Sequence, residues 1–323
     1  MSTVVPEISL ISLQNQSESD LKILKEALNS HGFFTITDHD IDDSLLDDSY
    51  TCAKEFFDLP EEIKNQYARP EIGGARGYTP FGKETALGEN VADLKEFWHL
   101  GPEINTSFDS RIHENIKVDE LLNFNTHFNT LFTSLNQLGI KVLESIALVL
   151  DLPKNFFEEK VIRGNSTLRL LHYPVRDKIS FGKNSDSFQI GDSYLLGKPH
   201  VDSGLLTILQ LDHVAGLQAQ LKNGEWHEIE PEEGTLVMNF GRLLEQWSNY
   251  KIKATVHRVI GYGQERYSIP FFFEPSIDSL IKPIDELGKI DSFKPFFYGD
   301  WLWEVTTQFI EQSGIKHLRK STN

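Results

Sequence analysis

Cysteine is nearly missing from this chain of 323 residues, in which Cys52 is the single example. One thiol cannot form an internal disulfide, which excludes a disulfide-stabilised scaffold and is typical of a reducing compartment. Cys52 lies in a helical pattern beside Ala53 and Phe56. We therefore expect it to be a buried, unreactive thiol.

Basic residues are in deficit. The chain has 31 Lys and Arg against 48 Asp and Glu, for a formal net charge of −17 and a pI near 5.1. Such a surface repels phosphate backbones, which argues against nucleic-acid binding through a broad basic patch. We expect no nucleic-acid partner.

Long apolar runs are also missing. No stretch approaches the ~20 apolar residues that a membrane-spanning helix needs. The first six residues, MSTVVP, have neither the charged region nor the apolar region of a secretory signal. The sequence therefore predicts a cytoplasmic protein with no membrane partner.

Apolar residues are plentiful in spite of these absences: 39% of the chain is hydrophobic and 22 residues are phenylalanine. Apolar residues recur every three or four positions from Val118 to Leu150, which predicts a long amphipathic helix with His127 on its solvated side. The first half of the chain otherwise mixes helices and strands. The patterns predict strands over 4–13, 33–37 and 93–98, and helices over 21–28 and 43–57.

Short strands with turn signals dominate after residue 165, which is typical of an all-β sandwich or barrel. The predicted strands are 166–173, 205–211, 226–229, 235–240, 255–262 and 267–273. A polar insertion at 176–192 interrupts them, and a loop of that length is a candidate lid. Residues 291–318 predict a closing C-terminal helix.

A metal-ligand pattern lies inside the β-rich half. Residues two apart on an extended strand face the same way, so His200 and Asp202 can aim at one point. His257, from a distant strand, would complete a site of two histidines and one carboxylate. That set, with the remaining positions open, is the facial triad of non-haem Fe(II) oxygenases.

An anchor for an organic acid follows the last ligand. Arg266 comes nine residues after His257, and a guanidinium can hold a carboxylate with two parallel hydrogen bonds. Ser268 lies two residues further on and shares its strand face. A His-x-Asp pair alone is more often a plain hydrogen-bonded pair, but its conjunction with His257, Arg266 and Ser268 favours a metal site.

Ordered motifs cover nearly the whole chain. The N-terminal half carries Gly32-Phe33-Phe34, Phe56-Phe57-Asp58-Leu59-Pro60, Arg76-Gly77-Tyr78 and Asp93-Leu94-Lys95-Glu96-Phe97. The C-terminal half carries Leu171-His172-Tyr173-Pro174, His200-Val201-Asp202, Asn239-Phe240-Gly241, His257-Arg258-Val259 and Arg266-Tyr267-Ser268. In this order and spacing the chain resembles the iron- and 2-oxoglutarate-dependent dioxygenases, in the branch related to isopenicillin N synthase.

The resemblance implies a fold that is mainly β with flanking helices: a double-stranded β-helix (jelly-roll) core, a helix-rich N-terminal region and a C-terminal helix. We divide the chain accordingly. Residues 1–115 form the N-terminal dioxygenase region, 116–160 the bracing helix, 161–275 the jelly-roll core and 276–323 the helical closure.

The resemblance also implies a reaction. His200, Asp202 and His257 would bind Fe(II), and Arg266 and Ser268 would hold 2-oxoglutarate, with the Tyr173 hydroxyl as a further candidate. The enzyme would couple oxidative decarboxylation of 2-oxoglutarate by dioxygen to hydroxylation, desaturation or cyclisation of a small-molecule substrate. Ascorbate would help to keep the iron reduced.

Four further residues are candidates for contact with the substrate or the ligands: Phe97, Arg169, His172 and Arg242. Arg169 shares strand parity with Tyr173 and either points into the cavity or forms a surface ion pair. For His172, a structural role weighs equally against substrate contact. Arg242 stands where relatives often have Asp, and either reads an anionic substrate or lies in solvent. For Lys95 and Glu96, the motif that contains them favours a structural role over a chemical one.

Two other functions stay open at this point. Some members of the branch are oxidases that use the triad without a keto acid. A catalytically silent jelly-roll that binds a small acid is the alternative from another class, although a binding module has no need of open metal positions. The sequence names neither the primary substrate nor the oligomeric state.

Overall fold

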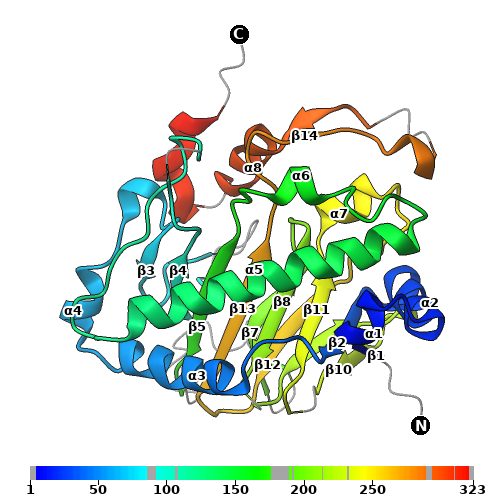
Figure 1. Ribbon diagram of the computed structural model, residues 1–323. Coiled ribbons are helices and arrows are strands. Elements are labelled where there is room, and N and C mark those ends of the chain that lie inside the picture. Colours follow the sequence, from blue (N-terminus) through cyan, green and yellow to red (C-terminus); the bar gives the residue numbers. More distant parts are fainter. Residues whose placement is uncertain are drawn as a thin grey trace.

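The computed structural model (Figure 1) describes residues 5–85, 92–105, 108–175, 189–190, 193–212, 214–230, 233–288, 293–308 and 310–319. Two β-sheets form the core and helices cover one side of the larger sheet (Figure 1). The predicted 176–192 lid lies almost wholly outside the described residues.

The larger sheet has eight strands in the order β1-β2-β11-β8-β13-β5-β4-β3. They are β1 (Glu7–Ser9), β2 (Phe33–Thr37), β3 (Gly77–Thr79), β4 (Glu96–Leu100), β5 (Thr167–Tyr173), β8 (Leu206–Leu211), β11 (Leu236–Phe240) and β13 (Arg266–Phe273). The N-terminal half thus supplies both edges, while the central strands come from the C-terminal half.

The smaller sheet has the order β10-β9-β12-β7-β6. Its strands are β6 (Gln189–Ile190), β7 (Ser193–His200), β9 (Leu217–Gln220), β10 (Trp226–Glu228) and β12 (His257–Gly261). Neighbouring strands of the β-rich half are antiparallel throughout the described pairs, and successive segments alternate between the two sheets. The predicted jelly-roll with flanking helices is confirmed.

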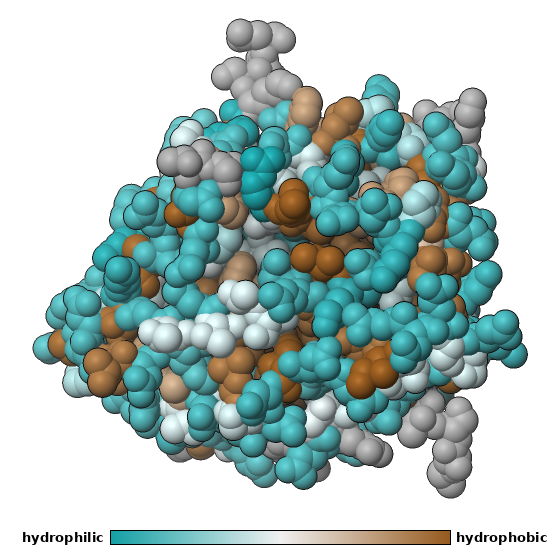
Figure 2. Space-filling view, in the orientation of Figure 1, coloured by the Kyte–Doolittle hydropathy of each residue, from teal (hydrophilic) through white to brown (hydrophobic). Residues whose placement is uncertain are grey.

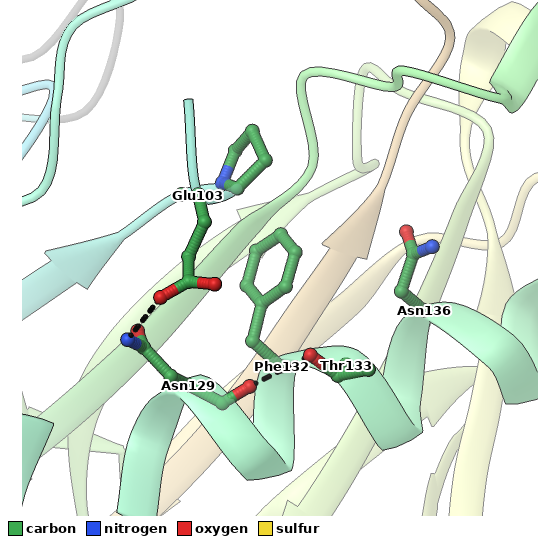
Figure 3. A pocket seen from close by; sticks show the side chains of 7 residues that line it. Glu103, Asn129, Phe132, Thr133 and Asn136 are labelled. Atoms are coloured by element: carbon green, nitrogen blue, oxygen red, sulfur yellow. Dashed lines mark hydrogen bonds between the residues drawn. The ribbon is translucent and has the colours of Figure 1, made fainter. Parts of the chain in front are cut away.

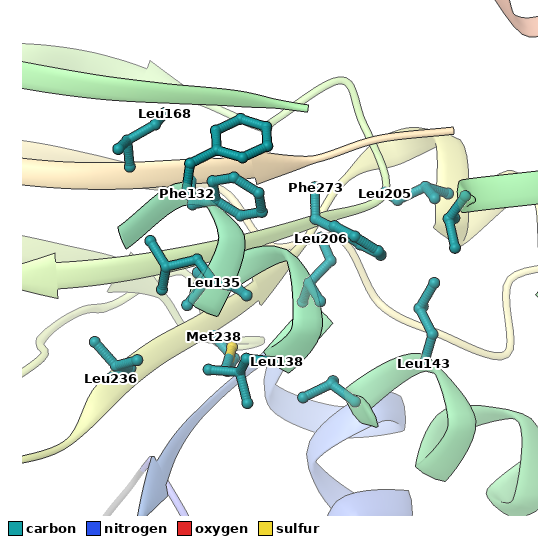
Figure 4. Packing of buried hydrophobic residues seen from close by; sticks show 14 of the residues in the cluster. Phe132, Leu135, Leu138, Leu143, Leu168, Leu205, Leu206, Leu236, Met238 and Phe273 are labelled. Atoms are coloured by element: carbon teal, nitrogen blue, oxygen red, sulfur yellow. The ribbon is translucent and has the colours of Figure 1, made fainter. Parts of the chain in front are cut away.

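The helices form the outer layer. They are α1 (Leu10–Gln14), α2 (Glu18–Glu26), α3 (Asp43–Phe57), α4 (Glu61–Asn65), α5 (Phe124–Val149), α6 (Glu158–Val161), α7 (Arg242–Trp247) and α8 (Tyr298–Thr306). The long helix α5 runs across the large sheet in Figure 1. Figure 4 shows its Phe132, Leu135 and Leu138 beside Phe273 and Met238 of the sheet.

Strand alternation gives the large sheet two apolar faces. On β13, Ile269, Phe271 and Phe273 belong to the large core under the helices. Phe271 meets the ring of Phe132 on α5 edge-on, with centroids 5.0 Å apart. Their neighbours Arg266 and Ser268 face the other way, toward the small sheet. The core under α5 therefore holds β13, the strand that carries Arg266 and Ser268, in place.

The predicted long helix begins six residues later than expected, at Phe124. The amide of Asn125 bonds to both backbone groups of Val118, accepting from its N–H at 3.0 Å and donating to its carbonyl at 2.8 Å. These bonds hold residue 118 outside the helix. His127 is not simply solvated, because its Nε2 lies 2.8 Å from the Ser49 hydroxyl on α3.

Other bounds also differ from those expected: the strand over 93–98 is β4 at Glu96–Leu100, and the helix over 21–28 is α2 at Glu18–Glu26. The predicted strand over 4–13 is a three-residue strand followed by α1, because the Ser9 hydroxyl caps a helix at Leu10. The predicted C-terminal helix is α8 followed by a 3₁₀ segment at Ile310–Leu318. Strand β3 of the large sheet and strands β6, β7 and β9 of the small sheet are additional to the predicted set.

The surface is largely polar on the face that Figure 2 shows, with hydrophobic groups scattered among the polar ones. None of the helices among the described residues is long and apolar enough to cross a membrane. Cys52 is half-buried rather than fully enclosed, and burial raises the pKa of its thiol, which disfavours the reactive thiolate.

Candidate metal centre

The two histidines of the predicted triad come from adjacent strands of the small sheet. His200 ends β7, His257 begins β12, and the two are direct cross-strand partners with ring centroids 4.3 Å apart. Asp202 lies two residues past the end of β7. The prediction that it shares a strand with His200 was therefore wrong. Its Oδ1 lies 3.6 Å from Nε2 of each histidine. The three side chains can thus offer ligand atoms within 4.8 Å of one another.

Each imidazole presents a lone pair to this point. Nδ1 of His200 lies 2.7 Å from the Lys198 carbonyl, and Nδ1 of His257 lies 3.2 Å from the Thr255 carbonyl. A carbonyl only accepts, so both Nδ1 atoms carry the proton and both Nε2 atoms are free to bind a metal. Burial lowers the pKa of His257 to about 4, which keeps this imidazole neutral.

The carboxylate of Asp202 is held by the large sheet. Its Oδ2 accepts from the Thr207 hydroxyl at 2.5 Å and from the Asn239 amide at 2.8 Å. Burial alone would raise the pKa of Asp202, but His257, His200 and these two hydrogen bonds hold it below its usual range. The carboxyl group is therefore ionised, and its Oδ1 points between the two imidazoles.

Sequence reasoning did not assign roles to Thr207 and Asn239. A signal was present for Asn239, which stands inside a recognised motif, and Asn239 pairs with Thr207 across β11 and β8. Cross-strand partners point to the same face, so their joint contact with Asp202 follows from register. The register itself was not readable from the chain.

The structure places Arg266, Ser268 and Tyr173 together. Arg266 is the cross-strand partner of Tyr173, and its guanidinium carbon lies 5.4 Å from the centre of that ring. Arg266 is only 1% exposed, and its Nε and Nη1 have no hydrogen-bond partner among the described residues. A buried guanidinium with unpaired donors fits the carboxylate of a bound acid.

The walls around the anchor are apolar. Phe97, Leu171, Tyr173 and Leu196 form one buried cluster inside the barrel, and Leu209 and Leu211 belong to another. Such walls exclude water and strengthen charge interactions with a bound acid. Phe97 therefore lies on the interior face.

Arg169 points inward, and its ion pair is buried rather than on the surface. It shares the interior face with Phe97 and stacks on that ring, with its guanidinium carbon 4.2 Å from the centroid. It also pairs with Glu84 at 3.2 Å and donates from Nε to the Nε2 of His99 at 2.6 Å. Glu84 in turn pairs with Lys95, which agrees with a structural role for Lys95.

His172 does not face the metal centre. Its ring stacks on Tyr267, and its two nitrogens lie 2.7 Å from Glu96 and 3.0 Å from Glu265. Strand alternation explains this, because Leu171 and Tyr173 on either side point inward. Of its two predicted roles, the structural one fits, and Glu96, which also pairs with Lys64 at 2.8 Å, belongs to the same buried network.

Arg242 begins α7 next to the metal centre. Its backbone N–H donates to the Asp202 carbonyl at 2.7 Å, while its side chain is exposed. The loop that carries Asp202 is thereby fixed to the start of α7. The exposed guanidinium is available to a ligand that approaches from solvent.

Glu274 supports the same loop from behind. It accepts from the Tyr298 hydroxyl at 2.9 Å and from the Leu205 backbone, and it fills the space that a Cβ on Gly204 would occupy. Burial raises the pKa of Glu274 to about 8. This residue was not predicted, because its contacts join segments about 70 residues apart.

A separate cleft of about 120 Å³ lies between the end of β4 and α5. Figure 3 shows its Glu103, Asn129, Phe132, Thr133 and Asn136, with a hydrogen bond from Asn129 to Glu103. It contains none of the three candidate ligands, and it opens on the helix side of the sheet. The metal centre is therefore not part of this cleft.

Comparisons with known proteins agree with this geometry. Residues 5–120 match the family model described as non-haem dioxygenase in morphine synthesis N-terminal, and residues 165–275 match that of the 2OG-Fe(II) oxygenase superfamily. The chain belongs to the 2OG-Fe(II) oxygenase superfamily. Its N-terminal region and its jelly-roll core match separate models of that family.

Individual relatives span most of the chain. A protein named probable iron/ascorbate oxidoreductase from Dictyostelium discoideum is 32% identical over 89% of this chain and 86% of its own. A 2-oxoglutarate-Fe(II) type oxidoreductase from Emericella nidulans is 32% identical over 80% of this chain and 75% of its own. The crystal structure of a full-length Neurospora crassa protein in complex with alpha-KG has a TM-score of 0.80 at 28% identity, covering 94% of this chain and 96% of that one.

The bond from Asn239 to Asp202 yields a first prediction. Asn239→Ala removes one of two donors that hold the carboxylate, so we expect Fe(II) affinity to fall by about 10- to 100-fold. Asn129→Ala, which removes an amide bonded to Glu103, is the matched control. Competition with a chromophoric chelator under anaerobic conditions measures both affinities. Equal affinities in the two variants would show that Asn239 does not hold the ligand.

The buried acid at Glu274 yields a second prediction. Its folded-state pKa of about 8 lies above the ordinary value of 4.5, so the protonated acid stabilises the fold at low pH and this stabilisation is lost as pH rises toward 8. Urea unfolding of metal-free protein from pH 5.5 to 8.5 should show a steeper loss of stability in the native protein than in Glu274→Gln. Parallel pH profiles would mean that Glu274 is ionised throughout.

Proposed function

We propose that His200, Asp202 and His257 hold Fe(II), and that Arg266, Ser268 and Tyr173 hold 2-oxoglutarate, in a dioxygenase that oxidises a small molecule. One observation carries this assignment: the same barrel contains three side chains whose ligand atoms converge and a buried arginine whose donors have no partner among the described residues. Membership of the 2OG-Fe(II) oxygenase superfamily supplies the reaction class.

The residues fit these two groups chemically. Two neutral imidazoles and one carboxylate leave three octahedral positions of a metal open. Arg266 and Ser268 lie on one strand face with their polar atoms inside the barrel, where a dicarboxylate could extend from the metal to the guanidinium. When bound, Fe(II) with 2-oxoglutarate and dioxygen supplies the oxidative decarboxylation that drives substrate oxidation, and ascorbate would help to keep the iron reduced.

The protein orients the metal ligands and excludes water from the site. Thr207 and Asn239 fix the orientation of Asp202, and the carbonyls of Lys198 and Thr255 fix both imidazoles. Apolar walls at Leu196 and Leu209 exclude water from the space beside the anchor. His200 is the exposed ligand, with 51% of its side chain accessible, so we place substrate entry on its side.

The primary substrate is a small molecule. Among the solved relatives, the Neurospora crassa protein has also been crystallised with alpha-KG and thymine, which supports a compact substrate beside the keto acid. Curated relatives at 28–29% identity include gibberellin 20 oxidase 1, 1-aminocyclopropane-1-carboxylate oxidase and the proline hydroxylase buaE, so relatedness does not select one substrate. We further place the chain in the isopenicillin N synthase-like branch, working in the cytoplasm, with Phe97, Arg169 and Arg242 near the substrate.

Succinate formation tests the assignment. Protein supplied with Fe(II), ascorbate and 2-oxoglutarate in air should release succinate, and His200→Ala and Arg266→Ala should each reduce the rate at least tenfold. Arg258→Ala is the matched control, because Arg258 is a sheet arginine that stacks on Trp226 and bonds to Gln218. Succinate release that is lost equally in Arg258→Ala, or retained in Arg266→Ala, contradicts the anchor.

A further inference from the structure

Arg76 is a buried cation that the oxygenase reaction does not use. It precedes β3 in the Arg76-Gly77-Tyr78 motif and is only 3% exposed. Its guanidinium lies against Gly101, where any Cβ would overlap the nitrogens, so glycine is required for it to fit. The glycine therefore leaves space for a charged group inside the protein.

The charge of Arg76 is not balanced. Its Nη1 donates to the Ala75 carbonyl at 2.6 Å and its Nη2 donates to the Asn165 side chain at 3.3 Å, while its Nε has no partner. Both partners are neutral, and no carboxylate pairs with Arg76 within the described part of the chain. Burial lowers the pKa of Arg76 to about 10, and no opposing charge offsets that effect. A buried unpaired charge is costly unless something neutralises it.

A cavity of about 40 Å³ adjoins this guanidinium. A single water needs roughly 10–15 Å³ of such space, so the cavity has room for a few atoms and no more. It is lined by Arg76, Arg111, His113, Asn165, Trp303 and Leu318, among others. It lies under α8 and the 3₁₀ segment that follows it.

A second buried nitrogen without a hydrogen-bond partner lines the same cavity. This nitrogen is the Nε2 of His113. Arg111 differs, because Asp109 accepts from its Nε at 2.9 Å and its Nη2 at 2.8 Å, and its guanidinium stacks on Trp303. The cavity therefore presents one unneutralised positive charge, a further polar nitrogen and apolar walls.

We propose that this cavity binds a small monoanion, held by the guanidinium of Arg76 and by Nε2–H of His113. One negative charge neutralises Arg76, whereas a dianion would leave an excess charge in a buried site. The volume admits a halide ion or a carboxylate group such as formate, but not a metabolite skeleton. The anion is a free halide ion or a small carboxylate such as formate, and it would join the C-terminal helices to the edge of the barrel.

Thermal unfolding of the full chain tests this proposal without iron or 2-oxoglutarate. Metal-free protein is heated at constant ionic strength while sodium gluconate, whose anion is too large for the cavity, is replaced by chloride, bromide, formate or acetate. We expect at least one small monoanion to raise Tm saturably, by about 2 °C or more. Arg76→Gln should abolish the rise, and Arg163→Gln, which alters an exposed arginine paired with Asp278, should keep it.

Two further measurements guard against a variant that fails to fold. His113→Phe keeps Arg76 and should weaken the anion dependence of Tm. A crystal of the native protein soaked in bromide should show an anomalous peak between Arg76 and His113. A Tm that rises only in chloride or bromide identifies a halide as the ligand. A Tm that also rises in formate or acetate shows that the cavity accepts a carboxylate group. A Tm that is insensitive to all four anions, or a bromide crystal with no peak in the cavity, overturns the proposal.

Discussion

The candidate metal centre depends on the distance between two sheets. Both imidazoles stand on the small sheet, where β7 and β12 pair at His200 and His257. Asp202 is held by Thr207 and Asn239, which stand on the large sheet. The three candidate ligands therefore bridge the two sheets of the barrel. The distances between the imidazoles and the Asp202 carboxylate depend on how the two sheets pack against each other. Apolar residues of both sheets, such as Leu209 and Leu217, supply that packing.

The same alternation of side chains ties the helices to the chemistry. On β13, odd and even positions divide between a core under α5 and an interior that holds Arg266 and Ser268. Phe271 and Phe273 pack against the helix, so the helix layer sets where the anchor lies. Buried polar networks such as His172 with Glu96 belong to the helix side, where they stabilise the scaffold without contacting the barrel interior.

Sequence reasoning recovered what depends on local pattern and chemical type. Helix 43–57 and strand 33–37 were predicted with the bounds that the structure has, because their periodicity is strong and their ends carry clear signals. The triad and the anchor were recognisable because few functions need those side chains at that spacing. The parity of Arg169 with Tyr173 gave an inward direction as one of two alternatives, whereas the direction of His172 was not deduced from the sequence.

The missed features depend on contacts between distant segments. Strand β7 follows a polar insertion and has little apolar alternation, so its pairing with β12 and β6 defines it. Asp202 was placed on a strand because His-x-Asp parity is compatible with one, whereas the chain leaves the sheet after His200 and is held by the start of α7 instead. Glu274 carries no local signal, and the motif that contains Arg76 does not indicate what its side chain does. Their roles come from Leu205, Tyr298 and Gly101, which meet them only in the folded chain.

The central claim is that one barrel binds Fe(II) and 2-oxoglutarate together, with the acid reaching from the metal to Arg266. An anaerobic visible-absorption titration of the Fe(II)-loaded protein with 2-oxoglutarate tests it most directly. We expect a charge-transfer band that saturates at one equivalent of 2-oxoglutarate and that requires a much higher concentration of 2-oxoglutarate in Arg266→Ala. Tight Fe(II) binding with no such band at any concentration of 2-oxoglutarate would contradict it.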